Sequence, residues 1–265
     1  MNQETELLNK ILQQLVTQQK ILEQLGSRLN AIESSLGIVE VHRSDVATNY
    51  KYPDLAPIQK AEDFDTPEKR KGWWDGLEEQ WQKALIANSL NVKLTSEALK
   101  TYNPTDEELQ YILESPTLIV VGAKGQNTRI DFELTNLSGV KHLTNLSILI
   151  VTHHQITSLA GIEYLNQLEN LFVNANQLTN LKEVHYLPNL TQLYCNDNQI
   201  KDLQPLARLT KLTTIHCNYN QLINFEGITI NHTQNLKNFI CLPNDKIYQR
   251  EIKRLEAINI QCKKG

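Results

Sequence analysis

Residues 146–167 read LSILIVTHHQITSLAGIEYLNQ, and the chain repeats this pattern four more times. The later blocks are LENLFVNANQLTNLKEVHYLPN from Leu168, LTQLYCNDNQIKDLQPLARLTK from Leu190, LTTIHCNYNQLINFEGITINHTQN from Leu212, and the partial LKNFICLPN from Leu236. The block starts lie 22, 22, 22 and 24 residues apart. A fixed period of this length is typical of a solenoid, in which each unit stacks on the next.

Each block opens with a short strand pattern. In the third block the apolar residues Leu190, Leu193 and Cys195 fit a strand with one face inward. Stacked blocks would place these strands in a parallel sheet, roughly 4.8 Å apart. The later apolar positions return along the convex side in turns or short 3₁₀ helices, because 22 residues leave little room for an α-helix. The pattern predicts an α/β solenoid with a curved parallel sheet.

An asparagine recurs just after each strand, at Asn176, Asn198, Asn220 and Asn244, and His154 takes this place in the first block. These blocks resemble the 22-residue, internalin-like class of bacterial leucine-rich repeats, whose unit reads L-x-x-L-x-L-x-x-N-x-L-x-x-L-x-x-L-x-x-L. The resemblance covers a little under half of the chain and implies the fold without implying a ligand. We expect the asparagines to satisfy backbone groups in the turn, and His154 to have a similar hydrogen-bonding role.

The residues between the inward positions should face outward on the concave side. One row runs through Ile150, Phe172, Tyr194, His216 and Ile240, with amides in the neighbouring rows. Aromatic anchors dominate interface energetics, so the pattern predicts a binding surface, although aromatics on strands also reflect β-propensity and cross-strand packing. The binding interpretation is preferred because solenoids commonly use this face. The candidate ligand-binding residues are Ile148, Ile150, Thr152, His153, Phe172, Asn174, Tyr194, Asn196, Asp197, His216, Asn218 and Tyr219.

Residues 1–37 follow a different period. Leucines recur every seven residues over about four heptads, and Ile11, Gln18, Leu25 and Ile32 follow the first four of them by three positions, which predicts a coiled-coil helix. RLNAIE, residues 28–33, is similar to the R-h-x-x-h-E pattern of parallel three-stranded coiled coils, which implies an Arg–Glu pair between helices. A homotrimer is favoured over a dimer, a tetramer or a single helix folded onto the repeats. The candidate oligomerisation residues are Leu8, Ile11, Leu15, Leu22, Leu25, Arg28, Leu29, Ile32 and Glu33.

The rest of the chain divides by composition. Residues 38–72 contain three prolines and a charged run, and are predicted to be a linker. Residues 73–123 are predicted to be a helical N-terminal cap, with a helix over 73–90, a capping box at Thr105 and Glu108, and a strand beginning at Thr117. Residues 124–244 hold the repeats, including a degenerate first unit, and 245–265 hold a C-terminal cap helix and tail. A cap is needed because a solenoid end exposes apolar core.

Composition argues against several classes of function. The formal net charge is −4, and residues of both signs are interspersed along the chain. The sequence therefore lacks the basic stripe that would indicate a nucleic-acid partner. The sequence contains no run of about 18 apolar residues, so no membrane-spanning helix is predicted. MNQETELLNK lacks the basic and apolar regions of a signal peptide, so a cytoplasmic location is expected. Cys195, Cys217 and Cys241 occupy inward repeat positions without metal-ligand spacing. We therefore expect neither metal nor cofactor.

The sequence also lacks the common catalytic motifs. No G-x-x-x-x-G-K-[ST], G-x-G-x-x-G, G-x-S-x-G or H-E-x-x-H pattern occurs, so no catalytic residue is proposed. The favoured interpretation is a non-enzymatic, multivalent module that binds a protein through the concave face. The alternative is a structural or regulatory subunit that assembles through the coiled coil into a larger complex, such as a bacterial defence or enzyme complex.

Overall fold

The computed structural model describes residues 64–90, 101–122 and 132–265. By contacts the chain divides into two units, Met1–Tyr52 and Pro53–Gly265, and every described residue belongs to the second. The predicted coiled coil and its oligomerisation residues lie outside the described residues, so they stay predictions.

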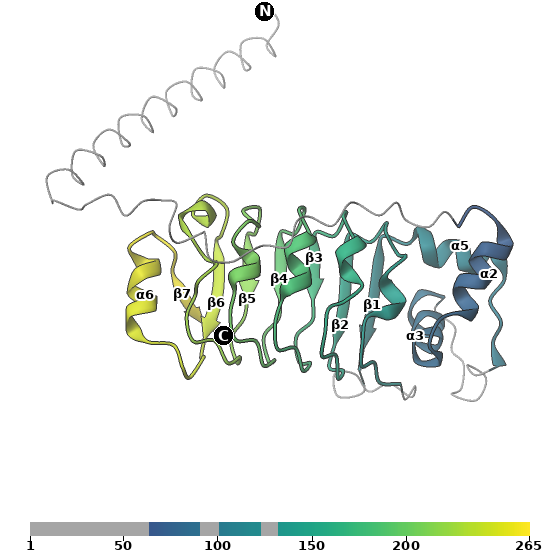
Figure 1. The fold of residues 1–265 in the computed structure, drawn as a ribbon, viewed down its shortest axis with the longest axis horizontal. Helices are drawn as coiled ribbons and strands as arrows, with labels where there is room; N and C mark the ends of the chain where they lie inside the picture. Colours follow the sequence, from purple (N-terminus) through teal and green to yellow (C-terminus); the bar gives the residue numbers. More distant parts are fainter. Residues whose placement is uncertain (1–63, 91–100, 123–131) are drawn as a thin grey trace, which may run out of the picture. The chain divides into compact units, whose positions relative to one another are not determined.

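Parallel strands stacked in chain order form the centre of the second unit (Figure 1). Neighbouring strands pair one repeat apart, so that Phe172 lies opposite Tyr194 and Tyr194 opposite His216. This register is the one that the 22-residue period predicts. The seven strands in the described part of the chain are β1 (Thr117–Val121), β2 (Ile148–Thr152), β3 (Asn170–Phe172), β4 (Gln192–Tyr194), β5 (Thr214–His216), β6 (Asn238–Leu242) and β7 (Cys262–Lys264).

Short 3₁₀ helices carry the chain back along the other side of each unit, as the repeat length predicts. The apolar positions of this return path, for example Leu178, Leu181, Val184 and Leu187, are fully buried and complete one core with the strands. Burying such a side chain is worth about 1.5–3 kcal/mol. The helices are η1 (Ser138–Val140), η2 (Ile162–Tyr164), η3 (Lys182–Tyr186), η4 (Gln204–Leu206) and η5 (Ile230–His232).

The recurring asparagines form a ladder through the turn that leaves each strand. Asn198 Nδ2 donates to the carbonyls of Val173 and Cys195, at 3.0 and 3.1 Å, and its Oδ1 accepts from the Leu178 amide at 2.9 Å. Asn176, Asn220 and Asn244 make corresponding bonds one repeat away. The ladder therefore supplies partners for backbone groups that the turn leaves buried, as expected.

His154 takes the acceptor half of this pattern. Its Nδ1 accepts from the Leu134 amide at 3.3 Å, where Asn176 Oδ1 accepts from Ile156. Among the described residues, its Nε2 has no hydrogen-bond partner. Burial lowers the pKa of His154 to about 4, so the ring is neutral near pH 7 and keeps the Nδ1 lone pair that the bond needs. The expected hydrogen-bonding role is confirmed.

Helices α2 (Pro67–Asp75), α3 (Glu79–Ser89) and α5 (Asp106–Glu114) precede the sheet. Residues 67–72 were predicted to be linker, and this was wrong: Thr66 Oγ1 accepts from the Lys69 amide and Pro67 occupies the first turn, which together start a helix. Arg70, in the same charged run, is buried and pairs with Asp106 through two hydrogen bonds of 2.7 and 2.6 Å. The charged composition had obscured these signals.

The predicted single helix over 73–90 is also wrong. Gly76 ends α2, and the chain restarts at Glu79, which turns the second part of the segment onto the first repeat. There Trp81 is fully buried and its Nε1 donates to the Asn136 carbonyl at 3.2 Å. A Cβ on Gly139 would lie 2.2 Å from the Trp81 ring. Only glycine allows this close approach between α3 and the first 3₁₀ turn.

The sheet begins inside the segment that was assigned to the N-terminal cap. β1 pairs with β2 along its full length, from Thr117 opposite Ile148 to Val121 opposite Thr152. It therefore supplies the strand of the degenerate first unit, whose apolar positions Leu134, Leu137 and Val140 are buried. The boundary at residue 123 was wrong because the first unit departs from the 22-residue spacing.

The C-terminal segment forms α6 (Gln249–Glu256) and then β7. Within residues 245–265, where a cap helix was predicted, α6 takes only eight residues, and Tyr248 precedes it and is 66% exposed. Leu255 carries the buried contact of the helix. No secondary structure was predicted for the tail, yet Cys262–Lys264 pairs with β6 and extends the sheet.

Candidate functional site: the outer face of the sheet

One row of side chains crosses the outer face of the sheet, the face turned away from the core. Parallel pairing brings one residue from each strand into this outer row. Its members alternate with fully buried positions, as a strand with one inward face requires. The outer row comprises Ile119, Ile150, Phe172, Tyr194, His216, Ile240 and Lys263.

Aromatic rings stack at the centre of the outer row. The ring centroids of Phe172 and Tyr194 are 4.4 Å apart with planes 14° apart, and those of Tyr194 and His216 are 4.2 Å apart at 40°. These separations are close to the strand spacing, so the register of the sheet imposes the stacking. All three side chains remain partly exposed. They form a preordered aromatic surface whose side-chain entropy is already reduced.

His216 continues this surface without adding charge near pH 7. Burial lowers the pKa of His216 below its ordinary value, so the imidazole is neutral in this range. Its ring therefore stacks on Tyr194 as an aromatic rather than as a cation. Ile150 and Ile240 continue the row on either side of the aromatic group, and both are half-buried.

Amide side chains flank the outer row on both sides, as predicted. Asn170 and Gln192 are half-buried on one side, next to the half-buried Ile148, and Asn174 and Asn196 are half-buried on the other. A partner seated on the aromatic group would thus meet amide donors and acceptors at both edges.

Two predicted contact residues do not belong to this exposed surface. Thr152 and Asn218 are each 6% exposed, so the prediction that they face a partner was wrong. Asn218 is covered because Gly265 lies against it, so closely that a Cβ added to Gly265 would stand 2.5 Å from Asn218 Nδ2. Thr152 ends β2, where it pairs opposite Val121, the last residue of β1.

A third set of candidates lies in the turns rather than on the strands. His153, Asp197 and Tyr219 have φ angles of 61°, 55° and 53°, as does their repeat equivalent Ala175 at 54°. This left-handed conformation is uncommon for residues other than glycine. It turns Tyr219 outward, where it is 52% exposed, and Asn196 Nδ2 donates to the carboxylate of the exposed Asp197 at 2.5 Å. These side chains border the aromatic group at the strand ends.

Sequence reasoning missed the two ends of the outer row. Ile119 is 45% exposed and extends the row by one strand beyond Ile150. An alignment of TLIVV, residues 117–121, with ILIVT, residues 148–152, could have found it. Lys263 extends the row beyond Ile240 and donates to the carbonyl of Lys237 and to Asn238 Oδ1, both at 3.0 Å. No repeat signal in the sequence indicated Lys263.

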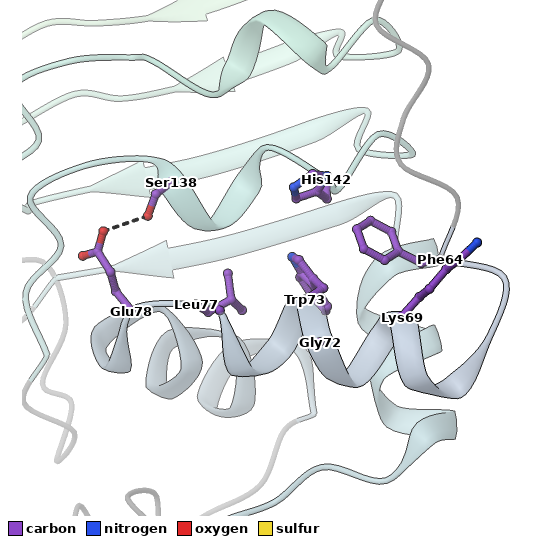
Figure 2. A pocket seen from close by; sticks show the side chains of 9 residues that line it. Phe64, Lys69, Gly72, Trp73, Leu77, Glu78, Ser138 and His142 are labelled. Atoms are coloured by element: carbon purple, nitrogen blue, oxygen red, sulfur yellow. Dashed lines mark hydrogen bonds between the residues drawn. The ribbon is translucent and has the colours of Figure 1, made fainter.

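A pocket of about 730 Å³ lies away from the outer row, between α2 and the first 3₁₀ turn (Figure 2). The Phe64 and His142 rings meet edge to face at one end, with centroids 5.1 Å apart. At the other end Ser138 Oγ donates to Glu78 at 3.0 Å, and Asn136 Nδ2 donates to both carboxylate oxygens of Glu78. None of the predicted ligand-binding residues lines this pocket. Its lining is Phe64, Lys69, Gly72, Trp73, Gly76, Leu77, Glu78, Ser138 and His142.

The described residues contain neither a metal-binding cluster nor a membrane-spanning helix. In the ranges 64–90, 101–122 and 132–265, no group of three or more His, Cys, Asp or Glu side chains is arranged to hold a metal ion. Across those same ranges, no helix combines the length and the hydropathy needed to cross a membrane.

Comparison with known proteins identifies the repeat. The family model of leucine-rich repeats, in two copies, matches residues 188–238. The chain carries leucine-rich repeats. No curated protein sequence matches the chain.

Several solved structures align with parts of the chain. A leucine-rich repeat protein of Leptospira interrogans aligns with a TM-score of 0.50 and 23% identity, over 62% of this chain and 40% of that one. An internalin, InlF, of Listeria monocytogenes aligns with a TM-score of 0.42 and 21% identity, over 49% and 36%. Internalin C2 of the same species aligns at 0.41 and 20%, over 68% and 88%. The chain thus spans less than half the length of the first two.

Proposed function

We propose that the chain binds a protein partner through the outer face of its repeat sheet, the face that the sequence predicts to be concave. Leucine-rich repeat proteins typically mediate protein–protein interaction. The observation that carries the proposal is the stacked group of Phe172, Tyr194 and His216, which is partly exposed on this face. Aromatic side chains held rigidly in advance lose little entropy on binding and dominate interface energetics.

The expected partner surface follows from the rows beside this group. An apolar or aromatic patch would cover Phe172 and Tyr194, while polar groups at its edge would pair with Asn174 and Asn196. The repeat backbone behind these residues is held by the asparagine ladder. The partner would therefore meet a surface that changes little on binding.

Alanine substitution of both central rings tests the proposal. Phe172→Ala with Tyr194→Ala should lower the affinity for a partner captured from cells that express the chain by at least tenfold, because two anchors are lost. The matched control is Tyr111→Ala with Tyr248→Ala, which removes two exposed rings that lie away from the sheet. Equal capture by the two double variants, with unfolding midpoints near wild type, would contradict the proposal.

Multivalency is a further part of the proposal. If the heptads of residues 1–37 join three chains, three repeat units would bind one multimeric target, and the second contact would become intramolecular. This arrangement would raise apparent affinity without new contacts. The heptad pattern supports it, together with the resemblance of residues 28–33 to three-stranded coiled coils.

A further inference from the structure

Two thiols meet at the end of the sheet. Cys241 lies in β6 and is fully buried, and Cys262 lies in the neighbouring β7 and is half-buried. Cys262 pairs opposite Phe239, and a register shift between Ile240 and Leu242 makes Cys241 the extra residue of β6. Both side chains belong to the core side of the sheet, and each thiol shifts the pKa of the other. The strand pairing and the bulge therefore make the two free thiols neighbours on adjacent strands.

The other thiols of the same column differ in accessibility. Cys195 and Cys217 are fully buried, and burial raises the pKa of Cys195 to about 12 and that of Cys217 above its ordinary value. The neighbouring Cys241 thiol lowers the pKa of Cys262, against the effect of burial. Since the thiolate is the nucleophile, Cys262 is the cysteine that an oxidant would reach and react with first.

We propose that Cys262 and Cys241 form a peroxide-reactive dithiol that closes to a disulfide between β6 and β7. The Cys262 thiolate attacks one oxygen of hydrogen peroxide, which breaks the O–O bond, gives a sulfenic acid and releases hydroxide. The Cys241 sulfur, losing its proton, then attacks the sulfenic sulfur and displaces hydroxide, which takes up a proton to leave as water. In sum, two thiols lose two electrons and two protons, and one peroxide becomes two waters.

The disulfide would fasten the C-terminal end of the solenoid. The closed loop would contain α6, whose Leu255 is buried, and Ile260, which is 2% exposed. A crosslink restricts the unfolded chain, so oxidation should raise the stability of this end. A reduced and an oxidised form of the same fold would then differ in how firmly β7 and α6 are held.

Mass spectrometry of the folded full chain after peroxide treatment tests the proposal. The expected product has lost two hydrogen atoms, joins the peptides of Cys241 and Cys262, unfolds several degrees higher than the reduced chain, and returns to it with dithiothreitol. Cys241→Val should abolish the crosslink, and valine suits the site because Val151 and Val173 hold the same position in earlier repeats. Cys217→Val, one strand away, is the matched control and should keep the crosslink.

Three results would overturn the proposal. The first is a folded chain that keeps four free thiols after treatment. The second is oxidation of Cys262 to a sulfinic acid, or to a disulfide between two chains, without the internal crosslink. The third is an internal crosslink that persists in the folded Cys241→Val variant.

Discussion

Tyr194 stacks on Phe172 with ring centroids 4.4 Å apart and planes 14° from parallel, although the two residues lie one repeat apart in the sequence. The contact arises because β3 and β4 pair in register, so each outward side chain meets its equivalent in the next unit. The same register places His216 4.2 Å from Tyr194. The period of the sequence thus becomes a continuous aromatic surface on the outer face of the sheet.

Asn198→Ala should lower the free energy of unfolding by about 3 kcal/mol, since two carbonyls and one amide lose their buried partner. Urea denaturation measures the change. The matched control is Asn196→Ala, whose side chain is half-buried on the outer face and bonds only Asp197 among described partners; it should cost about 0.5 kcal/mol or less. Similar losses in both variants would show that the ladder does not hold the turn.

His154 should make the fold sensitive to acid. Burial lowers its pKa from 6.5 to about 4, so the unfolded chain takes up this proton more readily than the folded chain. The contribution of neutral His154 to the free energy of unfolding is therefore fully present above pH 6.5 and is lost as the pH falls toward 4. His154→Asn restores the ladder residue without a titrating group. The unfolding free energy of this variant, measured by urea denaturation at several pH values, should fall less steeply between pH 6.5 and 4 than that of the wild type. The two slopes should differ by up to about 1.4 kcal/mol per pH unit. An unchanged slope would contradict this assignment.

Two glycines should respond to alanine in opposite directions. At Gly139 the added Cβ would lie 2.2 Å from the Trp81 ring, so Gly139→Ala should lower the free energy of unfolding by about 2 kcal/mol. At Gly72, inside α2, the added Cβ would have no atom within 4 Å, so Gly72→Ala should raise it by about 0.5–1 kcal/mol. Thermal unfolding of both variants checks the pair, and a tolerated Gly139→Ala would refute the close contact with Trp81.

The predicted trimer has a direct test in solution. Sedimentation of the full chain should give three times the mass of one chain, while a chain beginning at Phe64 should sediment as a monomer. The start at Phe64 keeps α2 whole, because Thr66 caps that helix. A monomeric full chain would remove multivalency from the proposed function and leave the binding surface in place.

The repeat period was enough to predict the sheet, its register and the outer row, because a parallel solenoid converts sequence spacing directly into spatial neighbours. Local signals that break the period were harder to interpret. Gly76 divides the predicted helix over 73–90, and Thr66 with Pro67 starts a helix within a charged stretch. The ends of the outer row, Ile119 and Lys263, lie in units without the regular spacing.

The burial of some residues predicted to be exposed on the outer face could not be inferred from the sequence. Strand alternation assigns Asn218 to the surface, but the segment that covers it comes from Gly265, far along the chain. The left-handed turn residues, such as Tyr219, were assigned to the same face without any sign of their backbone conformation. Such tertiary contacts and turn geometries depend on the whole packed unit rather than on the pattern of one strand.

Photo-crosslinking from the outer row tests the central claim most directly. Benzoyl-phenylalanine would replace Tyr194 in one variant and Tyr248, 66% exposed near α6, in another, and each would be irradiated in cells that express the chain. We expect a discrete crosslinked partner from position 194, lost when Phe172→Ala is added, and none from position 248. The same partner crosslinked from position 248 and not from 194 would show that the protein binds elsewhere.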